Sequence, residues 1–169
     1  MRDKFLKVLN NSGFIAKIIN PYMSELLQKF IDKFDDFFIK CEGIKGCAEN
    51  ILEALPTNKK LEDKICIATF ENENITSFID LILEYPEKDT ITIGYLLVNP
   101  EMRGKNIGST IVKLLNECAI AENYFRLRCI VQENNQNALN FWQKNGFRIE
   151  LENTNALNIK EFVLERDLI

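Results

Sequence analysis

The chain has 169 residues, of which 46% are hydrophobic and 27% are charged, and its formal net charge is −4. This composition is ordinary for a soluble globular protein and allows a hydrophobic core of normal size. It argues against a nucleic-acid-binding protein, which normally carries a basic face. No apolar run is long enough to span a bilayer, and residues 1–8 lack the apolar stretch of a signal peptide. We therefore expect no membrane contact and a cytoplasmic location.

The chain contains five cysteines and no histidine. Because no Cys-x-x-Cys pair occurs either, the sequence predicts no zinc site and no other metal site. The missing histidine also excludes Ser-His-Asp and Cys-His catalytic centres. Cys66, Cys118 and Cys129 lie in apolar runs and are expected to pack as small hydrophobic residues. Cys41 and Cys47 flank a glycine-bearing turn and are expected to be reduced thiols at the surface, with a disulfide between them on oxidation as the alternative.

The first 60 residues predict one strand and two helices. Residues 14–19 form an apolar run that predicts a strand, which Asn20-Pro21 ends. From Tyr22 to Lys40 a helix is predicted, because apolar residues recur at spacings of three and four. These are Leu26, Leu27, Phe30, Phe34, Phe37 and Phe38. The phenylalanines are expected to be mostly core, with the alternative that the outer ones line a substrate pocket. Gly43 is expected to cap this helix in the left-handed conformation, and a shorter helix is predicted over 48–55.

The remaining residues predict alternating strands and helices. Strands are expected over 64–70, 75–85 and 90–98, and they read as an antiparallel meander. A helix over 107–121, a strand over 125–131 and a helix over 136–144 follow, and residues 147–151 and 160–165 supply a last hairpin. This order predicts an α/β (α+β) fold in one domain spanning residues 1–169. Its sheet is expected to be mixed, mostly antiparallel and flanked by helices.

The segment after the third predicted strand of the meander has the features of a phosphate-binding loop. The strand stops at Pro100, and a short loop with glycines leads into the helix that starts near Ile107. Such a turn presents free backbone N–H groups at a helix N-terminus. Gly104 and Gly108 are expected to let phosphates approach the backbone. Arg103 and Lys105 either add positive charge there or point to solvent.

A second motif follows the next predicted strand, over residues 135–147. Together the two motifs resemble the GNAT family of N-acetyltransferases. The family's loop, Arg/Gln-x-x-Gly-x-Gly/Ala, is matched by Arg103, Asn106 and Gly108. Its second motif, Asn-x-x-Ala-x-x-Phe/Leu-Tyr-x-Lys-x-Gly-Phe, is matched by Asn135, Ala138, Phe141, Trp142, Lys144, Gly146 and Phe147. Two residues depart from the pattern. Asn106 replaces a glycine but tolerates the left-handed region, and Trp142 replaces a tyrosine, which removes a phenol from the reaction centre.

The resemblance implies a fold in which the strands before and after the long helix run parallel and splay apart to hold coenzyme A. It also implies transfer of an acetyl group from acetyl-CoA to an amine by direct attack in a ternary complex. The acceptor, a small-molecule or peptide amine, cannot be identified from the sequence, and a homodimer is an open alternative to a monomer. A non-catalytic acyl-CoA-binding or sensing domain is the alternative function, because both usual proton-transfer groups of the family are missing.

The resemblance assigns residues to three parts of acetyl-CoA. The pyrophosphate is expected to be bound by Arg103, Gly104, Lys105, Asn106, Ile107, Gly108 and Ser109. The pantetheine arm is expected to add to the strand edge formed by Leu96, Leu97 and Val98. A free N–H at Leu97 or Val98, with Val98 preferred, would also act as oxyanion donor. The opposite wall is expected to comprise Asn135, Ala138, Phe141, Trp142 and, near the nucleotide, Lys144. Ala138 and Phe141 can equally be core residues of an amphipathic helix.

The residues that usually transfer protons in the GNAT family are missing from this sequence. The glutamate that the family often uses would fall near Thr92, but the strand over 90–98 contains no carboxylate. Asp80, inside the apolar run 78–83, is the best substitute, because burial would raise its pKa. Its alternative is a structural aspartate bonded to a backbone group or a hydroxyl. Glu84 would share its face of the strand at alternating spacing. Trp142 can donate a hydrogen bond but cannot supply a proton.

Overall fold

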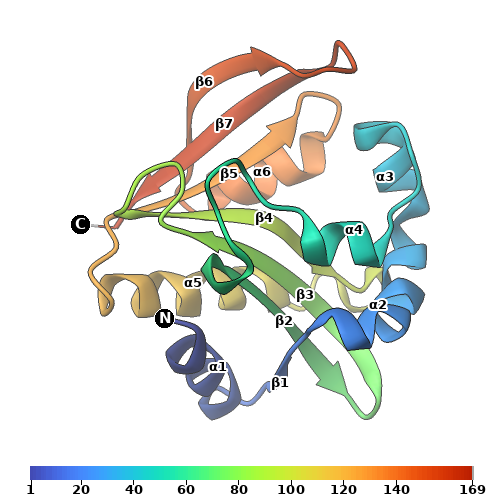
Figure 1. The fold of residues 1–169 in the computed structure, drawn as a ribbon, viewed down its shortest axis with the longest axis vertical. Helices are drawn as coiled ribbons and strands as arrows, with labels where there is room; N and C mark the ends of the chain where they lie inside the picture. Colours follow the sequence, from blue (N-terminus) through green and yellow to red (C-terminus); the bar gives the residue numbers. More distant parts are fainter. Residues whose placement is uncertain (169) are drawn as a thin grey trace.

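A seven-stranded sheet runs through the whole molecule, and the computed structural model describes residues 1–168 (Figure 1). The strand order is β1-β2-β3-β4-β5-β7-β6. All neighbouring strands are antiparallel except β4 and β5, which are parallel. The strands are β1 (Ile15–Ile18), β2 (Lys64–Glu71), β3 (Asn74–Leu83), β4 (Thr90–Val98), β5 (Arg126–Gln132), β6 (Arg148–Thr154) and β7 (Lys160–Asp167). The predicted mixed and mostly antiparallel sheet is confirmed.

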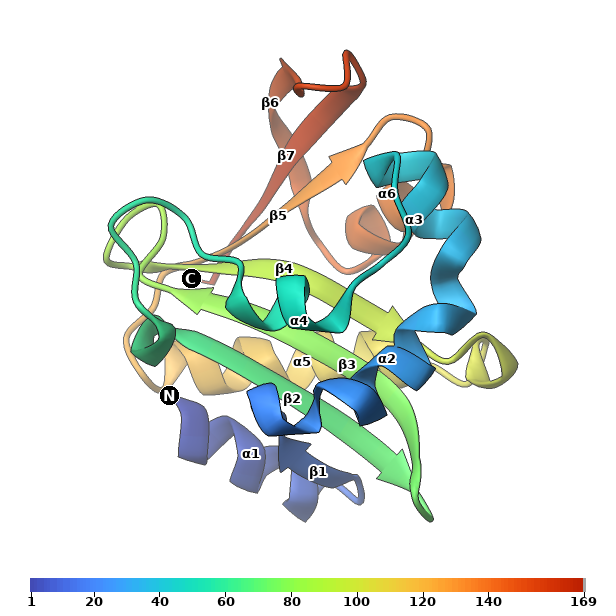
Figure 2. The same cartoon turned by 45° about the vertical axis from the view of Figure 1, so that its right-hand side comes forward.

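Helices cover both faces of this sheet (Figures 1 and 2). They are α1 (Arg2–Asn11), α2 (Ser24–Ile31), α3 (Asp35–Glu42), α4 (Ala48–Glu53), α5 (Ile107–Ile120) and α6 (Gln136–Lys144). One core lies between the sheet and α1, α5 and α6, and a second lies between β2–β4 and α2–α4. Within residues 1–168, none of these helices combines the length and the apolar character that a bilayer crossing requires.

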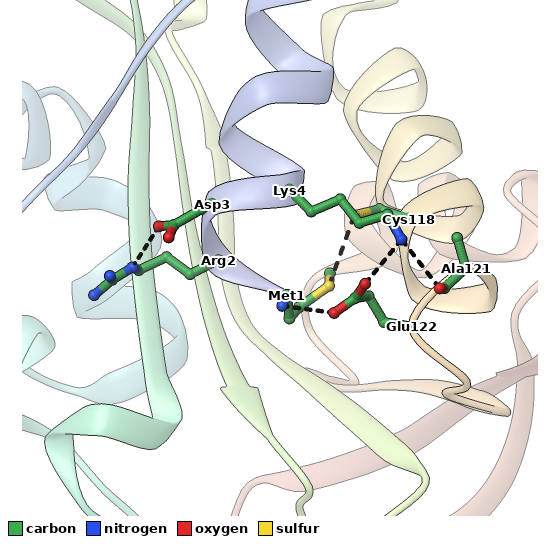
Figure 3. Close-up of polar contacts among 7 residues, drawn as sticks. All are labelled: Met1, Arg2, Asp3, Lys4, Cys118, Ala121 and Glu122. Atoms are coloured by element: carbon green, nitrogen blue, oxygen red, sulfur yellow. Dashed lines mark hydrogen bonds and ion pairs between the residues drawn. The ribbon is translucent and has the colours of Figure 1, made fainter.

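The sequence did not predict helix α1. Only Phe5 and Leu9 of this helix are fully buried, and both ends of the helix are polar, so the apolar pattern is short. Its place is fixed by contacts to the far end of α5. There Glu122 accepts hydrogen bonds of 2.8 Å from the Met1 amine and from Lys4 Nζ (Figure 3). Tertiary packing therefore selects a helix that its own residues specify only weakly.

The predicted helix over 22–40 is interrupted in the structure. It consists of α2 and α3, joined by one tighter turn of 3₁₀ helix at Asp32–Phe34. This turn lets Phe30, Phe34 and Phe38 all reach the core, and the rings of Phe30 and Phe34 lie 5.0 Å apart. The phenylalanine stripe is therefore mostly core, as expected. Gly43 ends α3 in the left-handed conformation with φ of 76°, which confirms the predicted cap.

Strand β4 contains the irregularity that shapes the site. Tyr95 pairs with Asp80 and Ile93 pairs with Leu81, so Gly94 is an extra residue on β4 and forms a β-bulge. A bulge bends its strand and increases the local twist. The parallel pairing of β4 with β5 also stops here, because it covers only Thr90–Ile93 and Arg126–Cys129. Beyond it the two strands diverge (Figures 1 and 2). We call the two strand ends that do not pair with each other, 94–98 and 130–132, the fork.

Candidate functional site

The loop after β4 has the backbone conformation that a phosphate site requires. Asn99 begins it by accepting a hydrogen bond of 3.2 Å from the Glu101 N–H through its side chain. The loop then reverses through Gly104 with φ of 78° and Asn106 with φ of 61°, both in the left-handed region. Helix α5 starts at the next residue. The expectation that asparagine can replace glycine at position 106 is confirmed.

This loop and the first turn of α5 contain several backbone N–H groups that are free to donate a hydrogen bond. The first N–H that finds an acceptor is that of Thr110, which donates to the Asn106 carbonyl at 2.9 Å. Within the described chain, none of the N–H groups from Gly104 to Ser109 donates to a protein acceptor. They lie in and just before the first turn of a 14-residue helix, where the helix dipole is positive. A row of free N–H groups at a helix N-terminus is a general type of anion-binding site.

The two loop glycines have different roles. A Cβ on Gly104 would meet no atom within 4 Å, so this position leaves the backbone open. A Cβ on Gly108 would lie 3.1 Å from the Phe141 ring and 3.6 Å from Val98 Cγ2. The space beside Gly108 is therefore filled by Phe141 and not left for a phosphate, which corrects the role expected from the sequence. Gly108 instead allows α5, α6 and β4 to pack closely below the fork.

The fork has a free backbone edge on its β4 side. The Asn99 N–H donates to the Thr76 carbonyl of β3 at 2.9 Å. Because N–H groups alternate in direction along a strand, that of Leu97 also points to β3, whereas those of Leu96 and Val98 point into the fork. Exposure supports an opening here, since Gly94 is exposed and the next two residues are half-buried although β4 is central in the sheet. This geometry favours Val98 over Leu97 as oxyanion donor.

The opposite wall is formed by the start of α6. Asn135 caps this helix, since its side-chain oxygen accepts a hydrogen bond of 3.3 Å from the Ala138 N–H. Ala138 and Phe141 are partly buried against the main core. Trp142 is only 7% exposed, and its ring lies 5.0 Å from that of Phe141 and 4.8 Å from that of Phe147. Its surroundings are those of a core residue.

The predicted cationic residues point away from the fork. The Arg103 guanidinium lies 5.8 Å from the Phe34 ring centre, on the side of α2 and α3. Lys105 lines a hollow of about 410 Å³ beside the β2–β3 turn. Lys144 is exposed and, with Arg148 and others, lines a second hollow of about 580 Å³ at the end of α6. Among the described residues, none of these three side chains makes a contact with the free N–H groups of the loop.

Asp80 lies in a closed environment. It is 3% exposed, and its carboxylate forms a 2.8 Å ion pair with Lys64 Nζ, which also donates to the Ala54 carbonyl at 3.0 Å. Burial raises the pKa of Asp80, and the Lys64 charge opposes this rise. The partner of Asp80 is thus a lysine, whereas the structural alternative expected from the sequence was a backbone group or a hydroxyl. An enclosed, paired carboxylate is poorly suited to take a proton from a substrate.

Glu84 lies outside the site. Strand β3 ends at Leu83, and Glu84 has φ of 53°, so the expected alternation with Asp80 is broken. Burial raises the pKa of the Tyr124 phenol and the exposed Glu84 carboxylate adds to this rise, so Glu84 lies near Tyr124, which follows the C-terminal end of α5. The phosphate loop is at the other end of this helix, about 20 Å away at 1.5 Å per residue.

Sequence reasoning missed a carboxylate that the fold brings to the fork. Tyr95 of β4 donates a 2.7 Å hydrogen bond through its hydroxyl to Glu42 Oε1, at the end of α3. Burial raises the pKa of Glu42, although the bond from Tyr95 lowers it in part. Burial and the Glu42 charge raise the pKa of Tyr95. The available signal was a glutamate in the last turn of a helix, where the dipole disfavours negative charge.

The cysteines need one correction. Cys66, Cys118 and Cys129 are buried as predicted. Cys41, expected at the surface, is also buried, because the end of α3 packs against neighbouring elements. Burial raises the pKa of Cys41 and that of Cys129, so neither thiol is activated as a nucleophile.

Comparison with known proteins agrees with this geometry. The model of the acetyltransferase (GNAT) family matches residues 27–147, well over half of the chain. A PaiA N-acetyltransferase from Thermoplasma acidophilum in complex with coenzyme A has a TM-score of 0.66 at 18% identity, over 92% of this chain and 99% of that chain. The ribosomal-protein-S18-alanine N-acetyltransferase from Escherichia coli has a TM-score of 0.69 at 10% identity, over 92% and 94%.

A third structure, an acetyltransferase of the GNAT family from Staphylococcus aureus, has a TM-score of 0.70 at 18% identity, over 93% of this chain and all of that chain. At such identities the structural likeness shows the fold alone. No curated protein sequence matches the chain. The family match, the forked sheet and the donor loop lead to one conclusion: the chain belongs to the GNAT family of acetyltransferases.

Proposed function

We propose that this N-acetyltransferase takes its acetyl group from acetyl-CoA and transfers it to an amine by direct attack in a ternary complex. The observation that carries the proposal is the row of unpaired N–H groups from Gly104 to Ser109, next to the free edge of β4. A diphosphate and an amide-bearing arm in one ligand match these two features. The structural neighbour in complex with coenzyme A supports the same choice.

The loop would bind the diphosphate mainly through its backbone. Six donors converge there, and the dipole of α5 contributes about 0.3–1 kcal/mol per charge at its first turn. The open backbone at Gly104 permits close approach. Ile107 and Ser109 take part through their N–H groups, because both precede the first intrahelical hydrogen bond.

The pantetheine arm would lie in the fork as an added strand. Its amides can pair with the free groups of β4 at Leu96 and Val98, in the manner of β-augmentation. Ala138 and Phe141 would form the apolar side of the slot, which agrees with their partial burial. The Val98 N–H would then stabilise the negative charge that develops on the carbonyl oxygen during attack.

The transfer itself needs one proton to leave the amine and one to reach the sulfur. The amine nitrogen attacks the carbonyl carbon, the C–N bond forms, and the C–S bond breaks to give an amide and free CoA. Trp142 cannot protonate the leaving thiolate. A thiolate is a good enough leaving group to take its proton from water, so the missing acid lowers the rate and does not abolish it.

Two measurements test the proposal. Calorimetry should detect binding of acetyl-CoA, and a thiol reagent should detect CoA release when the chain is mixed with acetyl-CoA and a panel of small amines and lysine-bearing peptides. Failure to bind any CoA derivative would refute it. The comparisons give no support to a non-catalytic sensing domain, and only firm binding without turnover on any amine would favour that alternative. That residues 1–169 form a single domain, and that the chain forms a homodimer, both remain predictions.

A further inference from the structure

The last turn of α3 is held beside the mouth of the fork. Asn134, in the connection between β5 and α6, donates through Nδ2 to the Lys40 carbonyl at 2.9 Å. Its Oδ1 lies 3.5 Å from the Cys41 thiol, which donates to it. Figures 1 and 2 both show α3 next to the β5–α6 region, although the two are far apart in sequence. One asparagine side chain therefore fixes the end of α3 to the far wall of the fork.

Glu42 is the last residue of this turn, and a hydrogen bond from β4, the strand on the other side of the fork, holds its side chain. Tyr95 lies directly after the bulge at Gly94, and its hydroxyl is 2.7 Å from Glu42 Oε1. The Tyr95 ring is supported by Phe38, at 5.9 Å between ring centres. The Glu42 side chain is half-buried, and no cation forms an ion pair with it among the described residues. A carboxylate is thus held by a neutral donor, the hydroxyl of a tyrosine whose backbone lies where β4 and β5 separate.

We propose that Glu42 is the proton acceptor for the amine substrate and that Tyr95 positions its carboxylate. This inference rests on the proposed function. As the C–N bond forms, Glu42 takes a proton from the attacking nitrogen, which has become positively charged. When the C–S bond breaks, Glu42 gives the proton to the leaving sulfur or to water and returns to its starting charge.

The charges around Glu42 suit this role. Lys40 and Cys41 are its neighbours on α3, Tyr95 faces it from β4, and the charge of Asp80, the β3 residue paired with Tyr95, acts on the Tyr95 hydroxyl. Burial and the helix C-terminus favour the neutral acid, whereas the Tyr95 hydroxyl favours the carboxylate. A base whose pKa is raised towards neutrality both accepts and releases a proton readily at pH 7.

A purely structural role is the competing explanation, in which the Glu42–Tyr95 bond only anchors α3. Glu42→Gln separates the two, because the amide oxygen still accepts the Tyr95 hydrogen bond but cannot take a proton. We expect unchanged acetyl-CoA affinity, an unchanged melting temperature and a fall in kcat/KM of about 10²–10⁴-fold. Glu53→Gln is the matched control. Glu53 is also the last residue of a helix, α4, but it is exposed, and its replacement should leave kcat/KM unchanged.

Tyr95→Phe gives a second readout that a structural role would not produce. Removing the hydroxyl donor raises the pKa of Glu42, so the acidic limb of the kcat/KM profile should move to higher pH. If the Glu42→Gln variant is as active as wild type and has the same pH profile, this inference is refuted while the proposed function stands. The same holds if the acidic limb of the Tyr95→Phe profile does not move. Lack of turnover by the wild-type chain on every amine overturns the proposed function, and this inference with it.

Discussion

Ser109→Asp should separate the stability of the chain from its affinity for acetyl-CoA. Ser109 is the third residue of α5, half-buried, and its N–H has no acceptor among the described residues. An aspartate there would interact favourably with the helix dipole and could accept hydrogen bonds from the loop N–H groups. The folded state should therefore be at least as stable as in wild type, by about 0–1 kcal/mol. The same carboxylate would occupy the donors that we propose bind the diphosphate.

The size of the binding defect follows from Coulomb's law. One added negative charge at about 6 Å from a diphosphate carrying about two charges costs roughly 1.4 kcal/mol at the dielectric constant of water. That equals about a tenfold rise in Kd. Partial exclusion of water would halve the effective dielectric constant and bring the rise to about a hundredfold. The competition for N–H donors acts in the same direction.

Calorimetry with acetyl-CoA at low salt measures this effect, and thermal unfolding monitors the fold. Ser109→Asn is the matched control, because it has nearly the same shape as aspartate and no charge, and its Kd should stay within about threefold of wild type. If Ser109→Asp melts at or above the wild-type temperature and binds acetyl-CoA equally well, the donor row at the start of α5 is not the diphosphate site, and the placement of the cofactor is refuted.

Three further predictions concern stability and the reaction. Lys64→Met should lower the free energy of unfolding in urea by about 3–5 kcal/mol, because Asp80 loses its buried partner; a change below about 1 kcal/mol would contradict the importance of the pair. Trp142→Phe should keep kcat within about threefold, since the packed ring and not the indole N–H matters, whereas a loss of about a hundredfold would assign that N–H a role in the reaction. Glu122→Gln should lower the melting temperature at pH 6 but not at pH 2. Lys4 and the Met1 amine lower the pKa of Glu122 from 4.5 to about 2, so their contribution is complete above pH 4.5 and is lost as the pH falls towards 2. An equal difference at both pH values would count against these contacts.

Local sequence determined most of the elements after residue 60 and the donor loop. Strands β2 and β4 and helices α5 and α6 lie within about two residues of their predicted bounds, because their apolar periods are regular and each carries its own start or stop signal. Asn106 could be placed in the left-handed region for the same reason, since the conformation depends on the residue and its immediate neighbours. Consequently the free N–H groups at the start of α5 were predictable without any tertiary contact.

Tertiary structure alone decided which side chains meet. The bond from Tyr95 to Glu42 joins residues 53 positions apart, and the pair of Lys64 and Asp80 depends on the register of β2 with β3. Gly108 faces Phe141 only because α5 and α6 pack together. Periodicity tells which face of an element is buried, but it does not tell which other element covers that face. For this reason the donor loop could be predicted from the sequence, whereas the contact of Glu42 with Tyr95 was found only in the folded chain.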